Sequence, residues 1–228
     1  MINQTLFNGK IKIVISEISD GNMRFFESKN EAEIIKNQEK LAKTLNLENN
    51  QIARVRTIYK NRTNYTDYHE ITNQNFPKYI IENPEEQIPV SDGLITRRSD
   101  IGFLLPLADC LGIVVLDEEQ GIIGLLHAGR QNIEQYGPKK FIEFFIKTFG
   151  SKPEILKLYF SPHATNYQIF KLNNQLLPEA AKEQLVEAGV SLTNLIDPKI
   201  DTVSSKNLPS HSNGDLTQRF AMAVRQTD

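Results

Sequence analysis

The sequence of 228 residues contains no tryptophan and a single cysteine, and charge of neither sign dominates it. One cysteine excludes an intrachain disulfide framework and is typical of a reducing compartment, so we expect a cytoplasmic protein. The 26 basic and 28 acidic side chains nearly cancel, which gives no electrostatic reason to expect nucleic acid or a membrane surface as a partner. The first residues lack the pattern of a signal peptide, and no run approaches the ~20 apolar residues of a membrane span.

The strongest local pattern lies in the middle of the chain. Two apolar runs, Leu111–Leu116 and Ile122–Leu126, flank the short polar connection DEEQG, which predicts a β-hairpin closed by Gly121 in a left-handed conformation. The lone cysteine, Cys110, precedes the first run and His127 follows the second, so both are expected at the open end of the hairpin. The turn type is open at this point, so Cys110 could face any residue from His127 to Arg130.

This pairing has two interpretations. Directly opposed residues on one face of a hairpin have Cβ atoms ~5 Å apart, which suits a shared metal ion or a thiol–imidazole pair. Alternatively, Cys110 is a small buried apolar group and His127 a core histidine whose hydrogen bonds are satisfied. The placement of both residues beside Asp or Gly, at the two ends of one hairpin, favours a functional site.

The other patterns predict strands alternating with amphipathic helices. Strands are expected at Lys10–Ile18, Met23–Phe26, Gln51–Tyr59 and Ile155–Phe160, with a closing segment at Phe220–Val224. Helices are expected over residues 29–46 behind a capping box of Ser28 and Glu31, over Gln131–Phe149 with an interruption at Gly137-Pro138 and a stop at Gly150, and over Gln175–Ala188. Asn61–Pro89 reads as a long connection carrying a strand or two. Since no repeat or linker is evident, one domain spanning residues 1–228 is the simplest organisation.

Five short words carry a resemblance to a known family. They are VSDGLIT at 90–96, LADC at 107–110, LLHAG at 125–129, SPHAT at 161–165 and SHSNGDLTQR at 210–219. In order and spacing, from about Val55 to Arg219, the chain resembles the YfiH-type family, long labelled laccase-like multicopper polyphenol oxidases and now regarded as purine nucleoside phosphorylases with adenosine deaminase activity. The resemblance implies an α/β (α+β) fold: a layered α/β/β/α domain with mixed sheets packed face to face and helices outside.

The resemblance also implies a metal site. In the family, a cysteine and two histidines bind the ion, and here they correspond to Cys110, His127 and the position of Tyr59, where the family has a Gln-Val-His-Gly word and this chain has Thr57-Ile58-Tyr59-Lys60. One thiolate and two imidazoles are a ligand set of catalytic zinc, which lowers the pKa of bound water to about 7. Zinc is therefore the implied cofactor. A phenol, with a pKa of ~10, is a poor substitute ligand.

The implied partners are a purine nucleoside and phosphate. After His127, Gly129 and Arg130 lead into a helix start, where free N–H groups and a guanidinium could cradle phosphate; otherwise Gly129 only permits a tight turn and Arg130 is a solvated charge. His211 and Arg219 fall on the family's Ser-His…Gly-Arg word, with Gln218 in place of its glycine. His163 in SPHAT is an added histidine that could replace the missing ligand or be incidental.

Two short acids complete the candidate catalytic set. Asp92 and Asp109 could orient a ligand imidazole or hold a substrate hydroxyl, although Asp92-Gly93 also reads as an ordinary turn. We therefore expect Cys110, His127, Asp92 and Asp109 to carry the chemistry, in a monomer or small homo-oligomer.

Three functions remain open on the sequence. The first is phosphorolysis or deamination of adenosine or inosine, weakened or rewired by Tyr59. The second is a metal-independent Cys–His hydrolase or amidase, with Cys110 as nucleophile and His127 as base. The third is a catalytically degenerate homologue that binds a nucleoside without turnover. Copper laccase chemistry ranks last, because four histidines and one cysteine cannot fill several copper centres.

Overall fold

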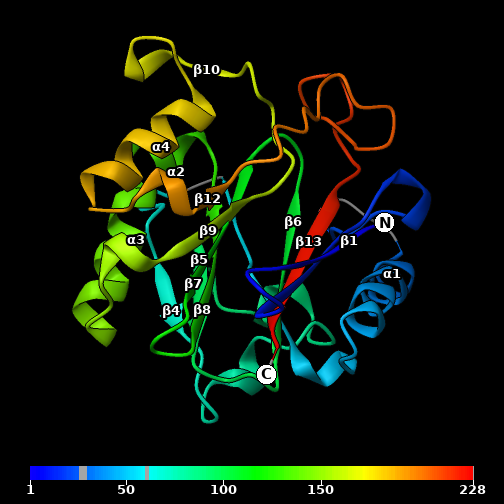
Figure 1. Cartoon of the computed structure of the whole chain (residues 1–228). Helices are drawn as coiled ribbons and strands as arrows, with labels where there is room; N and C mark the ends of the chain where they lie inside the picture. The colour runs from blue at the N-terminus through cyan, green and yellow to red at the C-terminus, as the bar shows by residue number, and fades with distance from the viewer. Residues whose placement is uncertain (26–29, 60–61, 228) are drawn as a thin grey trace.

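The protein contains two β-sheets that pack against each other between two layers of helices (Figure 1). The computed structural model describes residues 1–25, 30–59 and 62–227. The first sheet has the order β1-β2-β13-β6-β3, with strands Ile2–Leu6, Ile11–Ile15, Phe220–Gln226, Gly102–Leu107 and Ile52–Arg54. The second has the order β12-β9-β7-β8-β5-β4, with strands Leu195–Ile196, Lys157–Phe160, Leu111–Asp117, Ile122–Ala128, Gly93–Thr96 and Tyr68–Glu70.

Both sheets are mixed. Only β3 with β6 in the first sheet, and β12 with β9 and β4 with β5 in the second, run parallel. A separate two-stranded ribbon joins β10 (Gln168–Ile169) to β11 (Gln175–Leu176). The helices are α1 (Glu31–Thr44), α2 (Arg130–Glu134), α3 (Gly137–Phe149) and α4 (Leu177–Glu187). Short 3-10 turns occur at Ile18–Asp20, Asn49–Gln51, Phe76–Lys78, Glu85–Gln87, Pro153–Ile155, Phe170–Leu172 and Leu192–Asn194.

The period-two pattern of the central hairpin explains the layering. In β7, Val114 and Leu116 point into the core between the sheets, whereas Ile113 and Val115 point into the core beneath the helices. Because every residue of β7 and β8 is buried, both strands read as continuous apolar runs. The expected α/β/β/α fold is therefore correct.

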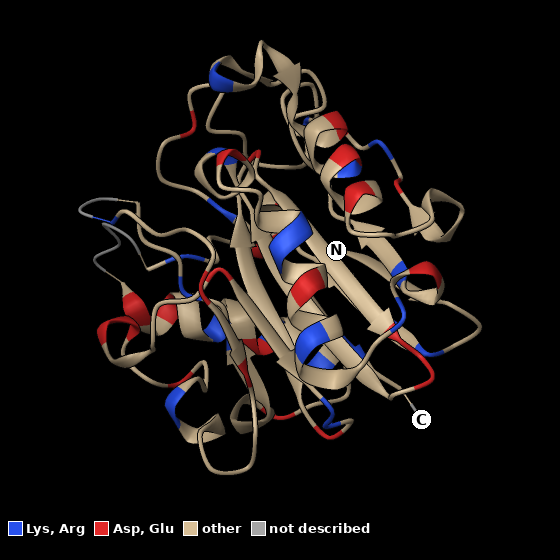
Figure 2. Ribbon diagram, turned by 90° about the vertical axis from the view of Figure 1, so that its left-hand side faces the viewer, with Lys and Arg blue, Asp and Glu red and all other residues tan. Residues whose placement is uncertain are grey.

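Each outer layer has its own reason to pack. Phe141 and Phe145 of α3 meet Gly124 of β8, where an added Cβ would lie within 3.0 Å of both rings. On the opposite side, Leu41 of α1 packs with Val14 and Leu104 of the first sheet. In the ribbon of Figure 2, the positions of charged residues lie mostly in helices and loops, and the strands behind them carry few. Within the described residues, none of the helices is both long and apolar enough to cross a membrane.

The structure corrects several predicted boundaries. Residues Met23–Phe25 form no strand, because the Asn22 side chain bonds the backbone of Arg24 and Met23 N donates to Arg219 O; β2 pairs instead with β1 and β13. The strand expected at Gln51–Tyr59 is limited to Ile52–Arg54. Phe26 and the capping serine, Ser28, lie outside the described residues, and the observed helix cap is Asn30, which accepts from Glu33 N.

The helix predictions hold with small shifts. The predicted interruption of the helix after the hairpin is confirmed: α2 and α3 are separated at Tyr136, which adopts φ 61°, and Gly150 ends α3 at φ 72°. The next helix begins at Leu177 rather than at Gln175, because Gln175–Leu176 pairs with β10.

Candidate functional site

The register of the hairpin brings Cys110 and His127 together. Gly112 pairs with His127 and Leu111 with Ala128, so the chain carries Cys110 opposite Gly129. A Cβ at Gly129 would lie 2.7 Å from His127 Cε1, 3.3 Å from His127 Nε2 and 3.2 Å from Cys110 Sγ. The thiol and the imidazole edge therefore flank one point, and only glycine leaves room for both.

Tyr59 completes this group from the chain that follows β3. Its hydroxyl lies 3.1 Å from His127 Nε2, and the two rings meet edge to face at 74°. The phenol also affects the pKa of the neighbouring Cys110 thiol. Tyr59 as a whole residue is 37% exposed, while its hydroxyl is directed at His127. We call Tyr59, Cys110 and His127 the central triad.

The members of the triad are uncharged at neutral pH. Burial lowers the pKa of His127 to about 3, with a smaller contribution from the positive charges of Arg24 and Arg62. Burial, and then the charge of Asp109, raises the pKa of the Cys110 thiol to about 11. Burial likewise raises the pKa of Tyr59 above its ordinary value. A neutral thiol, a neutral imidazole and a neutral phenol therefore lie next to one another in this site.

Two arginines stand beside the triad. The Arg24 guanidinium lies 5.5 Å from the centre of the Tyr59 ring, a cation–π geometry. Arg219 is half-buried, and burial followed by the charge of Arg24 lowers its pKa, which indicates that the two cations are close. Positive charge next to an uncharged triad favours an anionic ligand.

A cavity of about 900 Å³ opens above the triad. The triad, both arginines and the aromatic side chains of Phe25 and Tyr167 contribute to its lining, as do Arg130 and His211. This volume lies within the usual range for small-molecule sites, and mixed aromatic and polar walls are typical of them.

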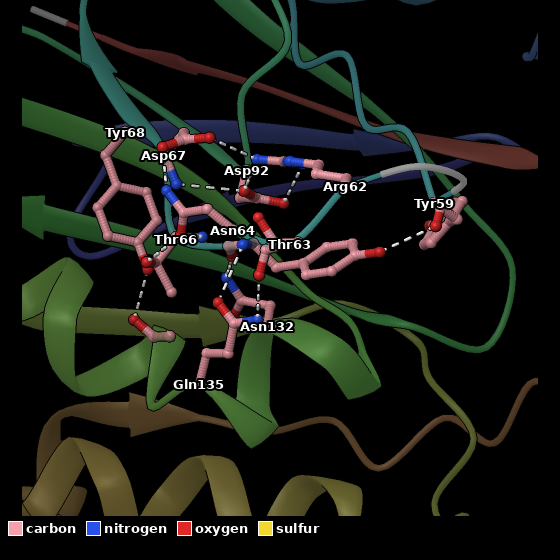
Figure 3. A network of polar contacts seen from close by, with 12 residues as sticks. Tyr59, Arg62, Thr63, Asn64, Thr66, Asp67, Tyr68, Asp92, Asn132 and Gln135 are labelled. Atoms are coloured by element: carbon pink, nitrogen blue, oxygen red, sulfur yellow. Dashed lines mark hydrogen bonds and ion pairs between the residues drawn. The ribbon is translucent and has the colours of Figure 1, made fainter.

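The predicted acids lie around the triad, and their carboxylates are already bonded to protein groups. Asp109 adopts φ 68°, accepts from Thr202 Oγ1 at 2.7 Å and Ser212 N at 2.6 Å, and thereby anchors the 202–212 tail beside Cys110. Asp92 is 1% exposed and pairs with Arg62, while its backbone carbonyl accepts from His127 N at 2.7 Å (Figure 3). Burial raises the pKa of Asp92, against the opposing effect of Arg62.

The predicted phosphate-binding residues separate into two groups. Arg130, His211 and Arg219 line the cavity, and Gly129 lies between Cys110 and His127. Arg130 is paired with Glu134 at 3.5 Å. His163 does not line the cavity: it is 1% exposed, with Nδ1 2.8 Å from Ser161 O and its ring against Phe160.

Two candidate functional residues, Arg24 and Arg62, were not predicted from the sequence. Arg24 follows the Asp-Gly-Asn turn, and it lies near the triad because the chain close to the C-terminus runs beside it there. Met23 N donates a hydrogen bond to Arg219 O. Arg62 lies in a polar connection with no pattern of its own. Neither residue has a local signal that could have identified it.

The donor set does not fit the implied zinc. Among the described residues, no group of three His, Cys, Asp or Glu side chains is arranged to hold a metal ion. The third position belongs to a phenol whose pKa is raised, and its hydroxyl is hydrogen-bonded to His127 Nε2. The nearby guanidinium groups of Arg24 and Arg219 further disfavour a cation.

Comparisons with known proteins agree on one family. Residues 13–176 match the family model described as "Multi-copper polyphenol oxidoreductase laccase". Similar solved structures include Bacillus licheniformis hypothetical protein YfiH (15% identity, TM-score 0.81, 95% of this chain and 93% of that chain) and Geobacillus stearothermophilus YlmD (15%, 0.82, 96% and 92%). Neisseria meningitidis protein NMB0706 is also similar (12%, 0.74, 96% and 95%). No curated protein matches the chain.

Proposed function

Because the chain belongs to the multi-copper polyphenol oxidoreductase laccase family, the YfiH family, we propose that it binds a purine nucleoside with phosphate and cleaves the nucleoside by phosphorolysis. The observation that carries the proposal is the pair of arginines, Arg24 and Arg219, beside an uncharged triad in the floor of a large cavity. The purine substrate class comes from the resemblance of the sequence words to the family.

Three features of the cavity support phosphorolysis. Guanidinium groups bind phosphate oxygens through charge-assisted hydrogen bonds, and Arg24 and Arg219 supply two of them. The aromatic rings of Phe25 and Tyr167 can stack on a purine. The cavity, at about 900 Å³, holds a nucleoside together with phosphate.

The reaction balances without a metal. A phosphate oxygen forms a bond to the sugar carbon C1′, the bond from C1′ to the purine nitrogen breaks, and its electron pair leaves with the purine. A proton must then reach the departing base. The proton that the attacking hydrogen phosphate releases on forming the ester balances the reaction by ending on the purine. The Tyr59 hydroxyl and the Cys110 thiol both remain protonated at neutral pH, so either can donate a hydrogen bond that stabilises the negative charge on the departing purine.

The same geometry disfavours the competing chemistries. Hydrolytic deamination needs a hydroxide, which zinc would generate, and the triad does not fit zinc. A Cys–His hydrolase needs a thiolate, whereas the thiol pKa of about 11 keeps Cys110 protonated and His127 Nε2 faces the phenol. The third alternative, a homologue that binds without turnover, is separated from our proposal by experiment.

The test measures bound zinc per chain and the release of free base from adenosine and inosine, with and without phosphate. We expect the wild type to release base only with phosphate and to keep this activity after chelation. The variant Tyr59→His restores the family's ligand and should acquire about one zinc per chain.

Three outcomes would contradict the proposal. Nucleoside-induced stabilisation without base release would identify a binding protein. Activity that disappears on chelation would identify a rewired metal site. Neither binding nor turnover would remove the purine assignment altogether, and Cys110 alkylation with loss of amidase activity would then favour the hydrolase.

A further inference from the structure

The segment that begins at Arg62 is held to the protein by a buried ion pair. Arg62 Nη1 donates to Asp92 Oδ1 at 3.1 Å, its Nη2 donates to Asp92 Oδ2, and the same Nη2 donates to Asp67 Oδ2 at 2.9 Å (Figure 3). The Arg62 side chain is 8% exposed and that of Asp92 only 1%. Such a two-pronged, buried Arg–carboxylate pair fixes both position and orientation.

Further bonds tie this segment to the helix that begins after the hairpin. Asn132 Nδ2 donates to Tyr65 O at 2.5 Å, Gln135 Nε2 donates to Thr63 O at 2.8 Å, and Tyr65 N donates to Gln135 Oε1 at 3.1 Å. Figure 3 shows these side chains converging from the segment and from α2. The segment is thus bound on two sides, by Asp92 just before β5 and by α2 together with its C-cap residue Gln135.

The network reaches both ends of the Tyr59–His127 contact. The Tyr65 hydroxyl donates to the Tyr59 carbonyl at 2.8 Å, and the Arg62 guanidinium lies 5.1 Å from the Tyr65 ring centre. At the other end, the Asp92 carbonyl accepts from the backbone N–H of His127. The backbone carbonyl of Asp92 therefore holds the strand that carries the imidazole. The Asp92 carboxylate holds Arg62, which lies over the ring of Tyr65, and the Tyr65 hydroxyl holds the Tyr59 carbonyl.

We propose that Arg62 and Asp92 are positioning residues that hold Tyr59 over His127 and Cys110. They act through Tyr59 and have no contact of their own with Cys110. The Arg62–Asp92 pair thereby sets how far the triad is exposed to the cavity. Asp92 acts by holding Arg62 and its segment in place and not as a catalytic acid. This role concerns the placement of Tyr59 and holds whether or not the protein turns over a nucleoside.

The test uses the alkylation rate of Cys110, which reports one site because the chain has no other cysteine. The paired variant Arg62→Gln/Asp92→Asn removes both charges and avoids leaving one buried charge uncompensated. The matched control, Arg98→Gln/Asp100→Asn, removes another Arg–Asp pair, with Nη2 2.6 Å from Oδ2. This pair precedes β6, whereas Cys110 follows the other end of that strand. Both double variants are also made in a Tyr59→Ala background.

We expect the paired variant to be alkylated about tenfold faster than the wild type, which corresponds to about 1.4 kcal/mol in the opening equilibrium. The control pair should leave the rate unchanged. In the Tyr59→Ala background, which is itself alkylated faster, the paired variant should add no further increase. A structural role alone would accelerate alkylation in both backgrounds.

Either of two results overturns the proposal: an unchanged rate in the paired variant, or the same acceleration with and without the Tyr59 ring. If the paired variant does not fold, Tyr65→Phe removes only the hydroxyl that holds the Tyr59 carbonyl, with the exposed Tyr136→Phe as its control. Tyr65→Phe should then raise the alkylation rate, again only when Tyr59 is present, and equal rates for the two variants would contradict the role.

Discussion

Acidification should destabilise this protein through one buried histidine. His127 is 3% exposed and has a folded-state pKa of about 3, whereas a histidine in an unfolded chain has a pKa of ~6.5. Between these values the unfolded state binds the extra proton, so the contribution of His127 is fully present above the unfolded pKa and is lost as the pH falls. From about pH 7 to about pH 4.5, linkage gives a loss of about 2.5 kcal/mol.

The comparison of wild type with His127→Gln isolates this contribution. Urea unfolding at the two pH values gives the free energy of unfolding of each protein, and the wild type should lose about 2.5 kcal/mol more than the variant on acidification. His211→Gln serves as control, because that histidine is exposed on the same cavity and should leave the acid sensitivity intact. If wild type and His127→Gln lose stability in parallel, His127 is not buried in its neutral form and the reasoning fails.

Three further changes test the site and the core. Gly129→Ala places a Cβ 2.7 Å from His127 Cε1, so we expect a loss of about 1–3 kcal/mol in urea unfolding; an unchanged midpoint would mean that the imidazole can move aside freely. Phe145→Ala removes a fully buried ring between α3 and Gly124 and should cost about 3–5 kcal/mol, against which exposed Phe170→Ala is the control. Arg219→Gln should weaken phosphate binding about tenfold in calorimetry while nucleoside affinity stays the same, and an equal loss for both ligands would refute its assignment to phosphate.

The elements that could be predicted from the sequence are those formed by residues close together along the chain. The hairpin was predictable because its two apolar runs and the turn residue Gly121 lie close together along the chain, and its register then places Cys110 beside His127 without any distant contact. The helices were predictable for the same reason, although Gln175–Leu176 was assigned to a helix because its pairing partner, β10, is too short to be recognised. The strand expected at Met23–Phe26 was wrong over its described residues, because the backbone of Met23 bonds to Arg219 near the C-terminus instead of to a neighbouring strand.

The sequence by itself determined the central hairpin, the family words and the placement of Cys110 and His127 at the open end of that hairpin, because these depend on residues close along the chain. Only the tertiary structure decided what faces that pair. Tyr59 meets His127 across a separation of 68 residues, Asp92 is engaged by Arg62 across 30, and Arg219 joins the site from the far end of the chain. Such contacts form when the two sheets pack together, and they leave no periodic pattern in the sequence. The triad, the neighbouring arginines Arg24 and Arg219, and the Arg62–Asp92 pair therefore became visible only in the folded chain.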